Sequence, residues 1–363
     1  LGLSLLYQGK DEDAYAAFFK AVWNAAFQDA GYFQLARLAL KAGKYEDAKD
    51  FIERSLSRNS NNQKAWHLKV LAFRKTGFMK EAKQTADDAL KQDKFNFGVL
   101  FEYSLLDPEK RSLLKARSRG NIHNYIEFSL DYAWAGLFEE ATRLIQMGIG
   151  EQDKGDVYPM AFYYKAWFEQ KAGKDRDALK TLQEAAGACP DYCFPNQPES
   201  VMVLPWAIEA NSGDYKAHYY LGNFWYNARN YKAAIHSWER SVEIFDQFPT
   251  THRNLALAYF NKRDEPGLAL AALEKAFRLD ASDARVLMEL DQLYKRLNRS
   301  PRERLDFLEK HLPQVEERDD LVLERISLFN LLGDHQKAYE LIMSRKFHPW
   351  EGGEGKVTGQ YFL

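Results

Sequence analysis

The stretch that decides the fold is HYYLGNFWYNARNYKAAIHSWERS, residues 218–241. It begins with the bulky His218 and the pair Leu221-Gly222, followed by the aromatic Trp225. The small residues Ala234 and Ser241 then stand on either side of the large Trp238. The features recur one period later, because His252 stands 34 residues after His218 and Tyr259 stands 34 residues after Trp225. A repeat of this length predicts one pair of antiparallel helices per copy, with each copy burying its apolar face against its neighbours.

Further copies of the pattern run through most of the chain. One copy starts at Tyr32 and the next at Trp66, and Gly43 and Gly77 stand where their first helices must stop. Glycine suits such a position because it readily adopts the left-handed backbone that commonly ends a helix. The copies are marked by Leu1, Tyr32, Trp66, Tyr125, Phe162, His218, His252, Leu287 and Val322. The predicted fold class is all-α, an α-α superhelix or solenoid of about nine helix-turn-helix repeats.

Two stretches interrupt the period. Residues 95–120 have the length of a helix pair without its signature, and residues 191–212 contain Pro195, Pro198 and Pro205. Because proline blocks regular helix, the second stretch predicts a long insertion between repeats. The predicted organisation is an N-terminal block at 1–190 with a truncated first repeat, a Pro-rich insertion at 191–212, a C-terminal block at 213–345 and a non-repeat segment at 346–363.

The composition favours a folded helical protein. Lys and Arg total 50 against 52 for Asp and Glu, a formal net charge of -2, so the chain has no global field that would attract nucleic acid or an anionic membrane. Hydrophobic residues make up 46%, and 21 Gly and 11 Pro among 363 residues are few for many short strands. No apolar run approaches the roughly 20 residues of a membrane-spanning helix. We therefore expect neither a nucleic-acid partner nor a membrane span, and the compartment is left open.

The repeated pattern resembles the tetratricopeptide repeat over most of the chain. This resemblance implies a protein-protein interaction scaffold in which the first helix of each repeat lines a concave groove, with the same few positions of each first helix facing a protein or peptide. Carried onto this sequence, those positions are Phe33, Arg37, Lys41, His67, Arg74, Lys75, Trp134, Tyr163, Trp167, Tyr219, Asn223, Tyr226, Arg253 and Phe260.

Two interpretations of these residues are open at this point. Aromatic rings with scattered Arg and Asn suit peptide binding, because rings supply contact area and guanidinium groups anchor carboxylates or carbonyls. The same rings also suit packing between repeats. A third possibility is that the array serves to self-associate. One tetratricopeptide subclass holds a terminal carboxylate with Lys and Asn, but only Asn223 matches it and Tyr219 stands in place of the Lys, which disfavours that role.

No motif in the sequence predicts an enzyme, a cofactor or a metal site. The chain contains no HExxH, GxSxG, Walker or GxGxxG motif, and no two histidines have the i, i+4 spacing of a helical metal site. The glycine-rich run at 351–355 lacks a following Gly-Lys-Ser/Thr and is interpreted as a turn, with Trp350 beside it as a candidate docking residue. Cys189 and Cys193 form either free thiols or a small disulfide.

A second resemblance concerns the C-terminal end. The run FHPWEGGEGK at 347–356 is similar to the end of large bacterial proteins that join an N-terminal β-rich, carbohydrate-enzyme-like domain to a tetratricopeptide array. It implies an alternative function, an accessory array that docks such a domain, with Trp134, Trp167 or Trp350 stacking on sugar or on the catalytic domain. Because the first repeat starts at its Leu-Gly pair, we expect the chain to be a fragment of a longer protein.

Overall fold

The computed structural model describes residues 1–153, 155–350 and 353–363. These residues form two compact units, Leu1–Cys193 (unit 1) and Phe194–Leu363 (unit 2). Every regular element among them is helical, and consecutive helices pair throughout. The predicted all-α solenoid of helix-turn-helix repeats is confirmed, whereas the block boundaries stay predictions.

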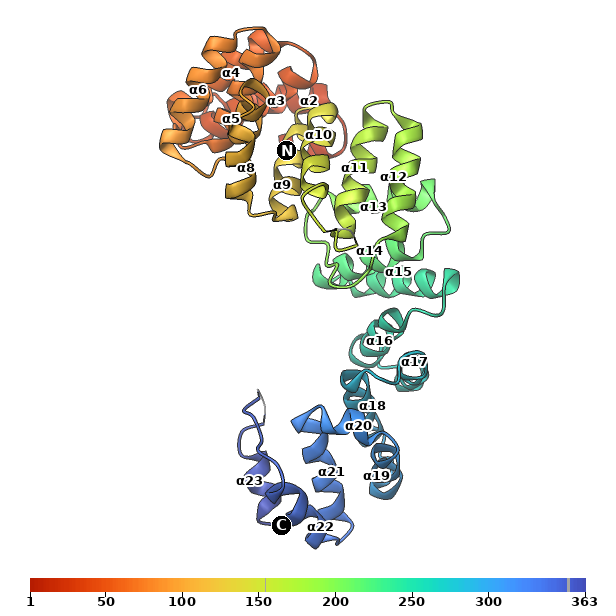
Figure 1. Cartoon of the computed structure of the whole chain (residues 1–363). Coiled ribbons are helices and arrows are strands. Elements are labelled where there is room, and N and C mark those ends of the chain that lie inside the picture. Colours follow the sequence, from red (N-terminus) through yellow and green to blue (C-terminus); the bar gives the residue numbers. More distant parts are fainter. Residues whose placement is uncertain (154, 351–352) are drawn as a thin grey trace. The chain divides into compact units, whose positions relative to one another are not determined.

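In unit 1 most helices pack against their neighbours in chain order (Figure 1). They are α1 (Gly2–Tyr7), α2 (Asp11–Ala21), the 3₁₀ turn η1 (Ala25–Phe27), α3 (Gln28–Lys41), α4 (Tyr45–Arg58), α5 (Gln63–Lys75), α6 (Met79–Gln92), α7 (Phe97–Leu106), α8 (Lys110–Ser118), α9 (Ile122–Trp134), α10 (Phe138–Ile149), α11 (Pro159–Lys171) and α12 (Asp175–Gly187). The shorter helices α7 and α8 occupy the stretch in which the sequence predicts a degenerate pair.

Unit 2 continues the same alternation. Its helices are α13 (Ser200–Ala210), α14 (Tyr215–Asn227), α15 (Tyr231–Ile244), α16 (Pro249–Ala258), the π-helical turn η2 (Tyr259–Arg263), α17 (Pro266–Leu279), α18 (Ala284–Arg296), α19 (Pro301–Glu309), α20 (Leu312–Glu316), α21 (Asp319–Leu331), α22 (His335–Met343) and α23 (Lys356–Tyr361). A single cluster of buried residues reaches from α16 to α22 and includes Leu273, Leu290 and Ile326.

Glycines fix the turns and the close contacts of the repeat. Gly43 ends the first helix of its pair with φ 72°, and the N–H of Lys44 closes that end by donating to the carbonyl of Ala39 at 2.8 Å. Gly222 in α14 acts differently, because a Cβ there would lie 2.3 Å from Nε1 of Trp238 in α15. The small residue lets the indole cross directly over the backbone of the neighbouring helix.

The Pro-rich stretch contains a helix, contrary to the expectation that proline blocks one there. Pro205 lies inside α13. Proline removes one backbone donor, but the side chains of Val203, Leu204 and Ala207 are buried on this helix. Burial of that apolar face outweighs the lost hydrogen bond.

Cys189 is exposed and Cys193 is buried, and no disulfide joins the two. Of the two alternatives left open by the sequence, the small disulfide is therefore not formed between them. Across the described ranges, each helix is too short or too polar to span a bilayer.

Candidate protein-binding surfaces

In unit 1, Trp134 is held inside the repeat array. Its ring packs edge-on against Tyr7 of α1, with centroids 4.7 Å apart, and the guanidinium of Arg37 in α3 lies 5.6 Å from its centroid. The indole also borders the core cluster that contains Leu6 and Phe18. Helix α9 thus packs onto the first helices of earlier repeats, where the sequence predicts an open groove.

His67 is a fully buried core residue, which is a correction to its predicted place on a binding face. Its ring lies 4.4 Å from the ring of Tyr132, and a Cβ on Gly98 would lie 2.5 Å from its Nδ1. Burial, assisted by the charges of Lys64 and Arg74, lowers the pKa of His67 to about 3. The imidazole is neutral and is inaccessible to a partner.

Arg74 belongs to a buried ion-pair network. Its Nε and Nη2 donate to the two oxygens of Glu102 at 2.6 and 3.2 Å, and the hydroxyl of Tyr132 donates to the same carboxylate. Burial alone would lower the pKa of Arg74, but the Glu102 carboxylate raises it overall. Lys75 pairs with Glu140, which is also buried. The sequence contains no local signal for Glu102, because its partners lie 28 and 30 residues away.

The remaining predicted residues of unit 1 are also packed to differing degrees. Phe33 and Tyr163 are buried, and Tyr163 is fully so. Trp167 is half-buried against Phe138 and Phe168, with ring centroids 6.1 and 5.7 Å away. For Phe33, His67 and Tyr163, packing between repeats is therefore the better of the two interpretations, and they are corrected from binding to core residues.

In unit 2, polar side chains link successive first helices. Asn254 of α16 donates through Nδ2 to Oδ1 of Asn223 in α14 at 3.3 Å. Arg253 donates through Nε to Oε2 of Glu289 in α18 at 2.7 Å, and Lys295 of α18 reaches Glu324 of α21 at 2.6 Å. We call this set the polar ladder: Asn223, Arg253, Asn254, Glu289, Gln292, Lys295 and Glu324.

Trp238 positions the start of the polar ladder. Its Nε1 donates to the carbonyl of Tyr219 and to Oδ1 of Asn223, both at 3.2 Å. Tyr219 is buried with its ring 5.0 Å from that of Phe248, so it is a core residue and a further correction. Tyr226 is half-buried beside Trp238, with centroids 5.4 Å apart.

Phe260 lines an apolar cavity of about 180 Å³ between α16 and α18. Leu257, Met288 and Leu293 form other walls, and the guanidinium of Arg296 lies 5.6 Å from the Phe260 centroid at the rim. Arg296 is exposed and makes no ion pair with any described residue. The cavity therefore combines an apolar interior with a cation at its edge.

A second cavity, of about 530 Å³, lies between α18, α21 and the C-terminal segment. It shares Met288 and Gln292 with the first cavity and is also lined by Trp350 and Lys356. We call the two cavities together the inner groove. The predicted docking residue Trp350 thus faces the repeat array of its own unit.

The C-terminal segment, residues 346–363, is bound to the repeat array at Asp319, the first residue of α21. Asp319 accepts hydrogen bonds from Nε of Arg345 at 2.6 Å and from the backbone N–H of His348 at 2.7 Å. Burial would raise the pKa of Asp319, but these two bonds lower it overall. Gly353 packs on the indole of Trp350, whereas residues 351–352 of the predicted turn lie outside the described residues.

The polar groups of these surfaces include amides, carboxylates and cations. No group of three His, Cys, Asp or Glu side chains that suits a metal ion occurs within the described part of the chain. In the inner groove the carboxylates of Glu289, Asp320 and Glu324 are each tied to an Arg or Lys. Amides, a few cations and apolar walls remain to meet a partner.

The sequence and the structure were compared with known proteins. Residues 33–97 and 203–250 match the family model described as tetratricopeptide repeat. The C-terminal part of a TPR repeat-containing protein from Cytophaga hutchinsonii is 14% identical, with 77% of this chain and 98% of that chain covered and a TM-score of 0.38. Pseudomonas aeruginosa pilF is 16% identical, with 63% and 92% covered and a TM-score of 0.34. The TPR domain of P58(IPK) is 15% identical, with 100% and 94% covered and a TM-score of 0.30.

The matched segments lie one in each unit, and both consist of the helix pairs described above. The resemblance to large bacterial carbohydrate-enzyme-like proteins stays a prediction. Two segments of the chain therefore match the tetratricopeptide repeat family, and arrays of this repeat act in general as protein-protein interaction scaffolds.

Proposed function

We propose that this chain is an interaction scaffold that binds an extended peptide segment of a protein partner in the inner groove of unit 2. The observation that carries the proposal is the apolar cavity at Phe260, which opens beside the polar ladder. A cavity that takes one side chain, next to groups that hold a backbone, suits a peptide better than it suits a flat protein surface.

The cavity at Phe260 serves as the anchor point. Its walls of Leu257, Phe260, Met288 and Leu293 accept one aliphatic or aromatic side chain and remove it from water. Methionine adapts its shape to different occupants, which favours a class of apolar residues over one defined residue. The apolar side chain in this cavity contributes affinity, and the surrounding polar groups fix the register in which the peptide binds.

The polar groups around the anchor match the needs of an extended backbone. The amides of Asn254 and Gln292 each offer a donor and an acceptor, which pair with peptide carbonyls and N–H groups. Arg296 and Lys356 are exposed cations without an ion-pair partner in the described part of the chain, and they suit a carboxylate of the ligand. We therefore expect a peptide with one apolar anchor and an acidic residue next to it.

The proposal is restricted to unit 2 for a physical reason. Among the predicted groove residues of unit 1, His67 lies in the core and Arg74 pairs with Glu102. Phe260 and Arg296 are partly or fully accessible and border a cavity. Accessible apolar and cationic groups are what a peptide ligand requires.

The test is selection from a phage-displayed library of random peptides against the full chain, followed by calorimetry of the enriched peptides. Phe260→Ala is expected to weaken their binding about tenfold or more, because it removes a wall of the anchor cavity. Phe27→Ala is the matched control, since Phe27 is an exposed aromatic residue of unit 1. Failure to enrich any peptide, or equal binding by Phe260→Ala, contradicts the proposal.

A further inference from the structure

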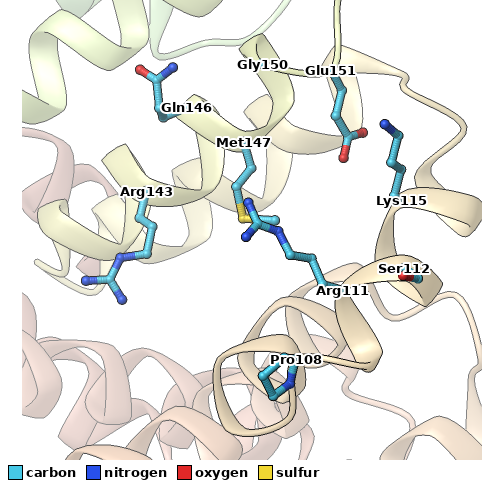
Figure 2. Close-up of a pocket in the computed structure, with 9 residues that line it drawn as sticks. All are labelled: Pro108, Arg111, Ser112, Lys115, Arg143, Gln146, Met147, Gly150 and Glu151. Atoms are coloured by element: carbon cyan, nitrogen blue, oxygen red, sulfur yellow. The ribbon is translucent and has the colours of Figure 1, made fainter.

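Unit 1 also has a cavity. It lies between α8 and α10, each of which is the second helix of its pair. It has a volume of about 620 Å³ and is open to solvent. Figure 2 shows Arg111 of α8 extending toward Met147 of α10, with the other residues that line the pocket around them. We call it the α8–α10 pocket, and its principal residues are Arg111, Ser112, Lys115, Arg143, Gln146 and Met147.

Helical periodicity explains why these residues meet. On α8, Arg111 and Lys115 stand four residues apart and share one face of the helix. On α10, Arg143 and Met147 have the same spacing. The neighbouring Leu144 is buried, so the polar and apolar faces of α10 are separated.

The pocket carries uncompensated positive charge. Arg111, Lys115 and Arg143 are exposed, and none makes an ion pair with another described residue. The half-buried Arg74 of the same unit, by contrast, is paired with Glu102. Glu151 is the acidic residue among those that line the pocket, and its Oε2 accepts a hydrogen bond from the hydroxyl of Tyr125 at 2.8 Å. Three cations and one carboxylate therefore line the pocket.

We propose that the α8–α10 pocket binds an acidic peptide segment of a partner protein, with carboxylates on both sides of an apolar side chain. The cations stand on two separate helices, which matches carboxylates spaced along a peptide. Met147 and Pro108 line the same pocket and provide the apolar contact between them.

Two features favour a peptide over other anions. A compact phosphate needs several donors that converge on one point, whereas these cations are spread over a wide, open pocket. A nucleic acid needs an extended positive field, and the net charge of the chain is -2. The site is independent of the inner groove, because it lies in unit 1 and is formed by second helices.

Fluorescence anisotropy with the full chain tests the proposal. The probe is a labelled peptide with glutamates on both sides of a leucine, and its counterpart has glutamine in place of every glutamate. Arg111→Glu/Arg143→Glu is expected to weaken binding of the acidic probe about tenfold or more, and added salt is expected to weaken binding to the wild type. The matched control is Arg176→Glu, an exposed arginine of α12.

Each outcome decides the question. Binding of the acidic probe that is lost with Arg111→Glu/Arg143→Glu and kept with Arg176→Glu supports the pocket. The milder Arg111→Gln/Arg143→Gln replaces the double variant if circular dichroism shows that the first is unfolded. Failure of the acidic probe to bind, equal binding of the glutamine counterpart, or displacement of the probe by inorganic phosphate or a single-stranded oligonucleotide at lower concentration than by unlabelled acidic peptide overturns the proposal.

Discussion

Arg304 in α19 donates two parallel hydrogen bonds to Asp291 in α18, from Nε to Oδ1 at 3.0 Å and from Nη2 to Oδ2 at 2.7 Å. Both side chains are almost completely buried. The same Nη2 reaches Glu324 of α21 at 2.7 Å. One guanidinium therefore joins three helices of unit 2 inside its core.

Removal of that guanidinium is expected to destabilise unit 2 strongly. Arg304→Ala leaves Asp291 buried without its counter-charge, and such a loss costs about 3–5 kcal/mol. Chemical denaturation followed by circular dichroism measures it. Arg278→Ala, at an exposed arginine of α17, should change the free energy of unfolding by less than about 0.5 kcal/mol. An equal effect of the two variants would show that the buried pair does not hold the helices.

Gly222 is expected to tolerate no side chain. In Gly222→Ala the new Cβ meets the indole of Trp238 at 2.3 Å, and overpacking of this kind costs about 1–3 kcal/mol. The control is Gly267→Ala in α17, where a Cβ meets nothing within 4 Å and better helix propensity stabilises by up to about 1 kcal/mol. Thermal unfolding of both variants should therefore shift the melting temperature in opposite directions, and a rise for Gly222→Ala would contradict the contact.

The buried His67 predicts a loss of stability in mild acid. Folding lowers its pKa from the ordinary value of 6.5 to about 3, so between these values the unfolded chain binds a proton that the native chain does not. Above pH 6.5 His67 is neutral in both states and does not lower the free energy of unfolding. Below pH 6.5 the free energy of unfolding falls as the pH falls. From pH 7 to pH 5 the free energy of unfolding should drop by about 2 kcal/mol through this one group.

Urea denaturation at a series of pH values checks this dependence. His67→Leu removes the titrating group, and its free energy of unfolding should vary less with pH than that of the wild type by about the same 2 kcal/mol. Identical slopes for wild type and His67→Leu would mean that His67 takes up its proton equally readily in the native and the unfolded chain.

Asp319 is expected to hold the C-terminal segment on unit 2. Asp319→Ala removes the bonds from Arg345 and from the His348 N–H, and should speed tryptic cleavage at Arg345 and Lys346 about tenfold, because opening becomes easier by about 1.4 kcal/mol. Limited proteolysis with mass spectrometry of the fragments measures the rate. Glu317→Ala is the control at a nearby exposed carboxylate, and an equal rate in both variants would place the restraint elsewhere.

The sequence predicts some residues of the inner groove and of the α8–α10 pocket and misses others. Phe260 and Arg253 are predicted from their positions in the repeat, whereas Met288, Gln292 and Arg296 are missed because the copy in α18 departs from the pattern. The spacing of Arg111 and Lys115 on one helix face is visible in the sequence. That Arg143 joins them is not, because it lies on another helix pair.

The sequence by itself determined the repeat. A period of 34 residues, a glycine such as Gly43 at the end of a first helix, and a small residue such as Gly222 beneath a large one are local requirements, and each is met by the residue type alone. The fold class follows because no other architecture needs these residues at this spacing.

Only the tertiary structure decided which side chains are accessible. His67 and Tyr219 lie on first helices and Phe260 lies in η2, which directly follows the first helix α16. All three are at positions predicted to face a partner, yet the first two are buried and Phe260 lines a cavity. Their exposure differs because it depends on which side chains of neighbouring helices lie over each position. Tyr132 packs on His67 and Phe248 packs on Tyr219, whereas no side chain fills the cavity beside Phe260. Those neighbours come from other repeats, so no local pattern specifies them.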